Sequence, residues 1–169
     1  MIVTLVPLLV WVLALGAAAV AAARAPRPRP RGFIVDRLLR YLFVFPVGVM
    51  GLWAASGHIF APEMAAASIG WQTSPFQFEV GVANLGLGVA GLYAAYRGFE
   101  ARLAVNLVLA CFLMGAGVGH LREIVQQGNF APGNAGPILF TDFLTPMTIF
   151  VLLAIAHRDR SASSSAATP

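Results

Sequence analysis

Charged residues are scarce in this sequence. Only 11% of the 169 residues are charged, whereas soluble domains carry roughly 25%. Hydrophobic residues make up 59% of the chain, and the mean hydropathy is +0.78. This composition excludes an ordinary soluble domain. It predicts an integral, multi-pass protein of the cell membrane, of the kind found in a bacterial inner membrane.

Cysteine and the common local motifs are also nearly absent. Cys111 is the single cysteine, so no intrachain disulfide can form. The sequence contains no phosphate-binding glycine loop, no dinucleotide-binding motif, no paired-cysteine metal motif and no serine elbow. The isoelectric point of about 10.2 would suggest nucleic-acid binding if the arginines lay on a soluble face. Their positions exclude nucleic acid as a partner.

Long apolar stretches are plentiful. They span residues 2–23, 38–57, 76–97, 102–121 and 137–157. Each is close to the 20 or so residues that cross about 30 Å of hydrocarbon as a helix. Because only helices and closed barrels satisfy every backbone group in lipid, we expect an all-α fold. The expected architecture is a polytopic bundle of five transmembrane helices, in which residues 1–23 form the first helix and 38–157 a four-helix core.

The distribution of arginine predicts the orientation. Ten of the eleven basic residues fall on one side, namely Arg24, Arg27, Arg29, Arg31, Arg37, Arg40, Arg97, Arg102, Arg158 and Arg160. The positive-inside rule makes that side cytoplasmic, with the N-terminus outside and the C-terminus in the cytoplasm. Residues 24–37 then form a basic, Pro/Arg-rich cytoplasmic linker, and residues 158–169 a disordered cytoplasmic tail.

The first apolar stretch has an alternative interpretation as a cleaved signal peptide. It lacks a basic n-region, and its apolar run is long for a signal sequence, so a retained helix is favoured. In the loop 58–75, Pro62 is expected to begin a short interfacial helix that ends at Gly70, and Trp71 is expected to anchor at the interface. Glycines within the helices are expected to allow close packing, namely Gly48, Gly51, Gly81, Gly86, Gly88, Gly91, Gly115 and Gly119.

Polar residues gather at the outer ends of four predicted helices. His120 and Glu123 are spaced i,i+3 and therefore project from one helical face. Charges at membrane depth cost about 2.5 to 3.5 kcal/mol each and usually face the bundle interior. The sequence therefore predicts one shared site built from His58, Glu79, His120, Glu123 and Asp142. Glu63, Asn84 and Asn134 are expected to support it.

Two chemistries fit this set of residues. Imidazole and carboxylate ligands suit a divalent metal such as zinc, iron or manganese, with all five residues as ligands. Without metal, the same groups would form an acid/base set, with Glu79 and Glu123 as catalytic carboxylates. A structural alternative also exists, in which each polar residue separately complements a helix dipole or forms an interhelical hydrogen bond.

The stretches "SGHIFAPEMAAASIGWQTSPFQFEVGVANLGLGVAGL" and "GVGHLREIVQQGNFAPGNAGPILFTDFLTP" resemble an uncharacterised family of small bacterial integral membrane proteins, a domain of unknown function. The resemblance covers about residues 45–155 and implies no activity. It implies that the family's polar positions are occupied by His58, Glu79, Asn84, His120, Asn134 and Asp142. The overall plan is also similar to five-helix proteins of the sterol-isomerase type, which move protons on a lipid.

These features favour a site at the extracytoplasmic face that acts on a hydrophobic or lipid-like substrate. Membrane lipid is the expected partner of the protein. The sequence leaves open whether the protein is an enzyme. One alternative is a small transporter or a proton or ion pathway. Another is a b-type haem protein with His58 and His120 as axial ligands, and a further one is an accessory membrane subunit. The substrate, the metal and the oligomeric state are not defined by the sequence.

Overall fold

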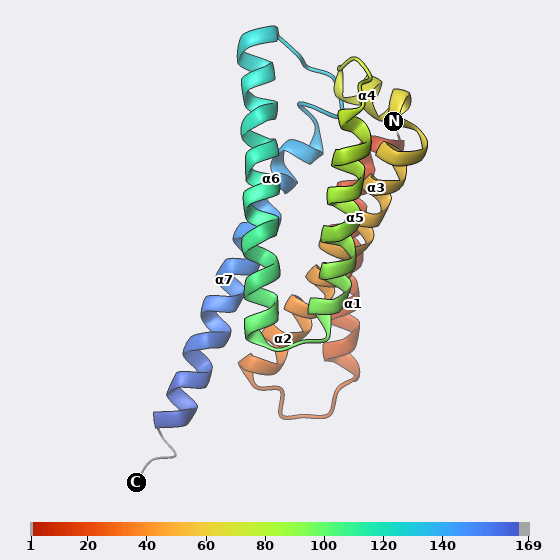
Figure 1. Ribbon diagram of the computed structural model, residues 1–169. Coiled ribbons are helices and arrows are strands. Elements are labelled where there is room, and N and C mark those ends of the chain that lie inside the picture. Colours follow the sequence, from red (N-terminus) through yellow and green to blue (C-terminus); the bar gives the residue numbers. More distant parts are fainter. Residues whose placement is uncertain (1, 166–169) are drawn as a thin grey trace.

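The computed structural model describes residues 2–165, and this part of the chain is helical with no strand (Figure 1). The helices are α1 (Ile2–Arg24), α2 (Arg31–Leu42), α3 (Met50–Phe60), α4 (Pro62–Ile69), α5 (Phe76–Ala95), α6 (Phe99–Gln127) and α7 (Pro137–Ser165). A π-helical segment, η1 (Phe43–Val49), joins α2 to α3 without a break. The short helix α4 begins at Pro62 and is followed by Gly70 in the left-handed conformation, which confirms the helix expected in this loop.

Five helical segments are long and apolar enough to span a membrane, as the sequence predicts. They are Leu5–Arg24, Arg31–Phe60, Phe76–Ala95, Phe99–Gln127 and Pro137–Ser161. Two boundaries differ from expectation. The second segment begins at Arg31, because Pro30 lies just before the first turn, where proline is tolerated; the linker is therefore only 25–30. Helix α7 continues to Ser165 through most of the expected disordered tail, whose residues 166–169 lie outside the described part.

Proline shapes the second span. Pro46 has no N–H to donate, and its ring displaces the preceding turn, so an α-helix cannot pass through it unchanged. The chain adopts the wider π-helical turn over Phe43–Val49 instead, which keeps the span continuous. Pro46 and Val47 then lie at the wall of an internal cavity.

The bundle consists of two helical pairs. Helix α3 packs along α5, and α6 packs along α7, while α1 covers α2 and η1 (Figure 1). At the α3–α5 contact, a Cβ atom on Gly51 would lie 2.8 Å from the Cα atom of Gly88, so only glycine permits this approach. Gly48, Gly81 and Gly91 are packed similarly.

The packing prediction is wrong for three other glycines. A Cβ atom at Gly86, Gly115 or Gly119 would meet no atom within 4 Å. Gly115 and Gly119, although spaced as GxxxG, therefore do not pack against another helix within the described chain. Gly115 is exposed, and Gly119 lines the cavity described below.

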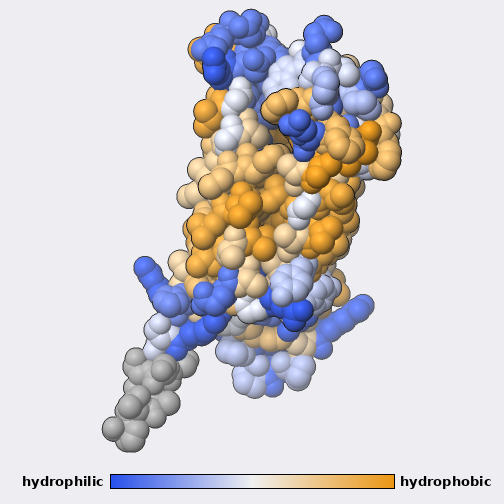
Figure 2. All heavy atoms as spheres, viewed as in Figure 1, coloured by the Kyte–Doolittle hydropathy of each residue, from blue (hydrophilic) through white to orange (hydrophobic). Residues whose placement is uncertain are grey.

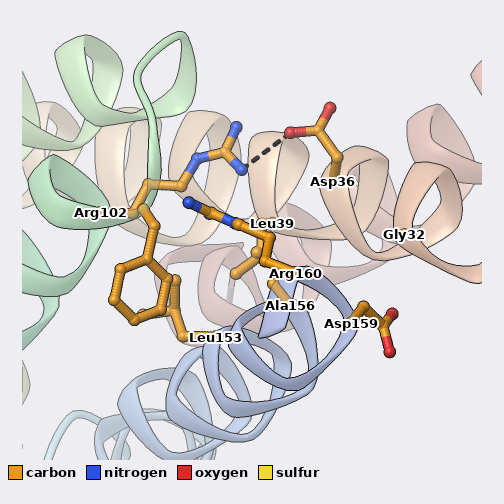
Figure 3. A pocket seen from close by; sticks show the side chains of 9 residues that line it. Gly32, Asp36, Leu39, Arg102, Leu153, Ala156, Asp159 and Arg160 are labelled. Carbon is orange, nitrogen blue, oxygen red and sulfur yellow. Dashed lines mark hydrogen bonds and ion pairs between the residues drawn. The ribbon is translucent and has the colours of Figure 1, made fainter. Parts of the chain in front are cut away.

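The two ends of the bundle differ in chemistry. We call the end where α5 meets α6 the basic end, and the end where α6 leads to α7 the histidine end. Figure 2 shows an apolar belt between hydrophilic surfaces at both ends. At the basic end, Arg102 is 5% exposed and donates to Asp36 Oδ1 at 2.9 Å, as Figure 3 shows. It also donates to the carbonyls of Ala94 and Ala95, which closes the last turn of α5.

Apolar side chains fill the half of the bundle nearest the basic end. Leu39, Phe43 and Ile149 are at most 1% exposed and belong to one continuous core with Leu42, Val47 and Leu153. This core joins α2, η1 and α7. A cavity described below lies toward the histidine end, and a smaller pocket of about 440 Å³ opens at the basic end beside Asp36, Arg102 and Arg160 (Figure 3).

Candidate functional site

A cavity of about 730 Å³ occupies the space between the two helical pairs. Its walls come from α1, η1, α3, α4, α5, α6, α7 and the loop before α7, and they are mainly apolar. Polar residues lining it include His58, Asn84, His120, Thr141, Asp142 and Thr145. A volume of 300–1,000 Å³ with a few convergent polar groups is typical of a small-molecule site.

Four of the predicted site residues thus meet at this cavity. His58 comes from α3, Asn84 from α5, His120 from α6 and Asp142 from α7. Because these residues are far apart in the chain, the fold itself creates the grouping. Asn134 is fully buried and contacts His120 from the loop between α6 and α7.

Asn134 determines which nitrogen of His120 carries the proton. Its Nδ2 atom donates to the carbonyls of Asn129 at 2.8 Å and His120 at 3.3 Å, so its Oδ1 atom must face the imidazole. That oxygen lies 2.7 Å from His120 Nδ1 and can only accept. His120 Nδ1 therefore donates, and in the neutral ring Nε2 carries the free lone pair.

His120 Nε2 faces Asp142. The distance from Nε2 to Asp142 Oδ2 is 3.7 Å, which is longer than a hydrogen bond but short enough for strong electrostatic coupling. Both residues are buried, with 8% and 2% of their surfaces exposed. The indole of Trp71 stacks near the imidazole, with ring centroids 6.4 Å apart. Both groups line the cavity, so each can exchange a proton with a molecule bound there.

His58, on α3, also contacts an amide side chain through its Nδ1 atom. Its Nδ1 atom lies 2.5 Å from Oε1 of Gln77, a residue in the first turn of α5 that is only 5% exposed. The sequence predicted Glu79 as the ligand or catalytic carboxylate that this helix contributes to the site. Gln77 points inward instead, and Glu79 is exposed in the first turn, where a negative charge favours the helix dipole.

The remaining predicted carboxylates lie away from the cavity. Glu123 is half-buried and accepts from Asn129 Nδ2 at 3.4 Å, and Glu63 is exposed in the first turn of α4. Neither lines the cavity. Within residues 2–165 no group of three or more His, Cys, Asp or Glu side chains is arranged to hold a metal ion. The five predicted ligands therefore do not form one cluster.

A lid closes the cavity at the histidine end. The N–H of Gly133 donates to the carbonyl of Ser68 at 2.9 Å, and Asn129 Nδ2 donates to the carbonyl of Ile69 at 3.0 Å. These bonds tie α4 to the loop 128–136, which crosses to α4 before α7 begins (Figure 1). A Cβ atom on Gly133 would lie 2.6 Å from the Ser68 oxygen, so the contact requires glycine.

Sequence reasoning missed several residues of the site. Trp11, Trp53 and Trp71, the three tryptophans of the chain, all line the cavity. Trp11 donates from Nε1 to Thr145 Oγ1 at 3.2 Å, which joins α1 to α7. Trp71 was expected only as an interface anchor. No local spacing connects these residues, so their convergence is visible only in the fold.

The fold and the cavity define a five-span helical bundle that encloses an apolar chamber with a buried histidine–aspartate pair. The chain belongs to the family described as "Family of unknown function (DUF6790)", whose profile matches residues 4–162. This confirms the resemblance to an uncharacterised family. No curated protein and no solved structure gives a significant match.

Proposed function

We propose that this integral membrane protein binds a hydrophobic, lipid-like molecule in the cavity and acts on it by proton transfer at His120 and Asp142. The observation that carries the proposal is the burial of this coupled pair against a mainly apolar chamber of about 730 Å³. Isolated ionisable groups within a membrane are costly and usually serve function. Asn134 supports the role of His120 by keeping its Nε2 atom available as a base.

The rim of the cavity favours entry from the bilayer. Trp53 and Phe60 of α3 line the cavity yet are 37% and 83% exposed, so they present large apolar surfaces outward. The hydrogen-bonded lid formed by α4 and the loop 128–136 covers the histidine end. An apolar molecule would therefore enter the chamber from the hydrocarbon layer of the membrane. Exposed apolar side chains are stable in that layer.

A proton or ion pathway is less well supported. It would need polar groups that continue from Asp142 to the basic end. The described core there consists of apolar side chains such as Leu39, Phe43 and Ile149, and Asn106 on α6 is also fully buried. Asn106 Nδ2 donates to the carbonyl of Pro146 at 3.2 Å, so this side chain also stabilises the proline-containing turn of α7.

The proposal is tested by identifying the amphiphiles that remain bound to the protein during purification. Purified protein is extracted with organic solvent, and the released amphiphiles are quantified by mass spectrometry. Gly119→Leu places a side chain in the chamber, because Gly119 lines it and a Cβ there meets nothing within 4 Å. Gly115→Leu, one turn away and exposed, is the matched control.

The expected result is one enriched amphiphile, near one per protein, in the wild type and in Gly115→Leu but not in Gly119→Leu. The enriched molecule would then be offered to wild-type protein and to His120→Gln, and only the wild type should convert it or exchange its carbon-bound protons for solvent deuterium. Equal enrichment in all three proteins would refute the cavity as the binding site. An absorption spectrum of the same sample tests the haem alternative, which requires a Soret band.

A further inference from the structure

The polar lining of the cavity also identifies the chemistry of the ligand's polar end, if the proposed function holds. The charged or titratable residues among the described lining are Asp142, His58 and His120, with no arginine or lysine. We infer that the ligand is an uncharged, single-chain amphiphile whose polar end is a hydroxyl group, such as a long-chain alcohol.

An anionic head group does not suit this chamber. A carboxylate or phosphate placed there would lie near Asp142 with no cation to compensate its desolvation. The arginine nearest this end in the sequence, Arg122, is exposed and donates to Gln126 Oε1 at 2.9 Å. The arginines at the basic end are separated from the cavity by the apolar core. Fatty acids and phospholipid head groups are therefore excluded from the polar site.

A cationic head group gains little here either. Asp142 is the one carboxyl group among the described lining; it is 2% exposed and already faces His120 Nε2 at 3.7 Å. An ammonium group would have to lose its hydration in a mainly apolar chamber and compete with His120 for this single buried carboxyl group. The electrostatics therefore favour an uncharged polar end.

The hydrogen-bond inventory favours a hydroxyl over a carbonyl. His120 Nε2 is an acceptor, because Nδ1 already donates to Asn134. Thr141 Oγ1 donates to the carbonyls of Pro137 and Ile138, so its lone pairs are also acceptors. A ligand that only accepts would leave these groups without a donor, whereas a hydroxyl supplies one and can also accept.

The rest of the chamber fits an alkyl or isoprenoid chain. Apolar side chains line it from the histidine site toward Pro46 and Leu109. Leu109 lies roughly 16 Å along α6 from His120, from the helical rise of about 1.5 Å per residue. A chain directed from the lid toward the core would bury its length against Trp11, Phe112 and Leu113.

The three tryptophans provide the readout, since all of them line the cavity. Wild-type protein in nanodiscs is titrated at neutral pH with dodecanol, dodecanoate and dodecyltrimethylammonium, each brominated at the chain end to quench fluorescence. Quenching is compared at equal probe concentration in the bilayer. The alcohol should reach half-maximal quenching at a concentration at least about tenfold lower than either charged probe, which corresponds to about 1.4 kcal/mol. Gly119→Leu should weaken the alcohol's effect to the level of the charged probes, and Gly115→Leu should not.

A charge-matched pair of variants locates the source of the selectivity. Met64→Lys and Glu63→Gln each raise the net charge by one, but only Met64 lines the cavity. Met64→Lys should reduce the discrimination against dodecanoate, whereas Glu63→Gln should leave it unchanged. Equal effects of the two variants would overturn the inference, because selectivity would then follow surface charge.

The outcomes separate this inference from the proposed function. If dodecanoate or the ammonium probe quenches as well as the alcohol, and Gly119→Leu abolishes both, the cavity binds amphiphiles but the hydroxyl assignment is wrong. If no probe distinguishes the wild type from Gly119→Leu, the proposed function itself fails.

Discussion

His120 on α6 and Asp142 on α7 face each other across 3.7 Å at the wall of the cavity. The loop between these helices supplies Asn134, which orients the imidazole through its Nδ1 atom. One helical hairpin therefore carries the acid, the base and the group that positions the base. The opposing pair, α3 and α5, supplies His58 and its partner Gln77.

Replacing Asn134 should disturb both stability and the imidazole. Asn134→Ala removes the acceptor of His120 Nδ1 and the donor to two carbonyls, which should lower the free energy of unfolding by about 1 to 3 kcal/mol. NMR of the imidazole nitrogens should show a mixture of tautomers in place of the Nδ1-protonated form. Asn84→Ala is the control, because Asn84 Nδ2 bonds only to the carbonyl of Val80 in its own helix. Equal changes in both variants would contradict the assigned role.

The glycine contact between α3 and α5 should be intolerant of any side chain. In Gly51→Ala, the new methyl group would lie 2.8 Å from the backbone of Gly88, and the helices must separate. We expect a loss of about 1 to 3 kcal/mol in the free energy of unfolding. Gly86→Ala on α5 meets no atom within 4 Å and should be neutral or stabilising. Unfolding in mixed micelles would measure both, and a stable Gly51→Ala would refute the packing account.

Arg102 should stabilise the basic end. Arg102→Met leaves the last carbonyls of α5 and the carboxylate of Asp36 without their donor. Because Asp36 is partly exposed and contacts two further arginines, the expected loss is about 1 to 3 kcal/mol. Arg97→Met, at an exposed residue stacked on Tyr93, should cost less than about 1 kcal/mol. A thermal unfolding comparison that showed no difference would contradict this role.

The orientation predicted from arginine remains to be tested. In a Cys111→Ser background, Ser74→Cys marks the loop before α5, and Glu100→Cys marks the start of α6; both sites are exposed. The positive-inside rule predicts that a membrane-impermeant maleimide labels Ser74→Cys in intact cells and Glu100→Cys only after permeabilisation. The reverse pattern would place the histidine end in the cytoplasm.

Most of the fold can be predicted from the sequence because the length of an apolar segment is a local property. All five spans were found in this way, with errors at their ends. The π-helical turn was not expected, since proline can also be accommodated by a kink. The continuation of α7 was missed because a serine-rich composition says little about a segment that extends an existing helix.

The candidate site was only partly predictable. Helix length and connectivity placed His58, His120 and Asp142 at one end and Asn84 deeper on its helix, and all four line the cavity. Helix length and connectivity do not show which face of a helix is buried. Because α5 is apolar on most sides, its pattern could not show that Gln77 is buried beside His58 while Glu79 is exposed. The pairing of Arg102 with Asp36 joins distant segments and has no local signal.

The most direct test of the central claim is photo-crosslinking with a long-chain alcohol that carries a diazirine in its chain. The cavity account predicts adducts on lining residues such as Trp53, Phe112 and Ala116, and their loss in Gly119→Leu but not in Gly115→Leu. Adducts confined to outward-facing residues such as Val108 and Val125, with no difference between the two variants, would contradict it.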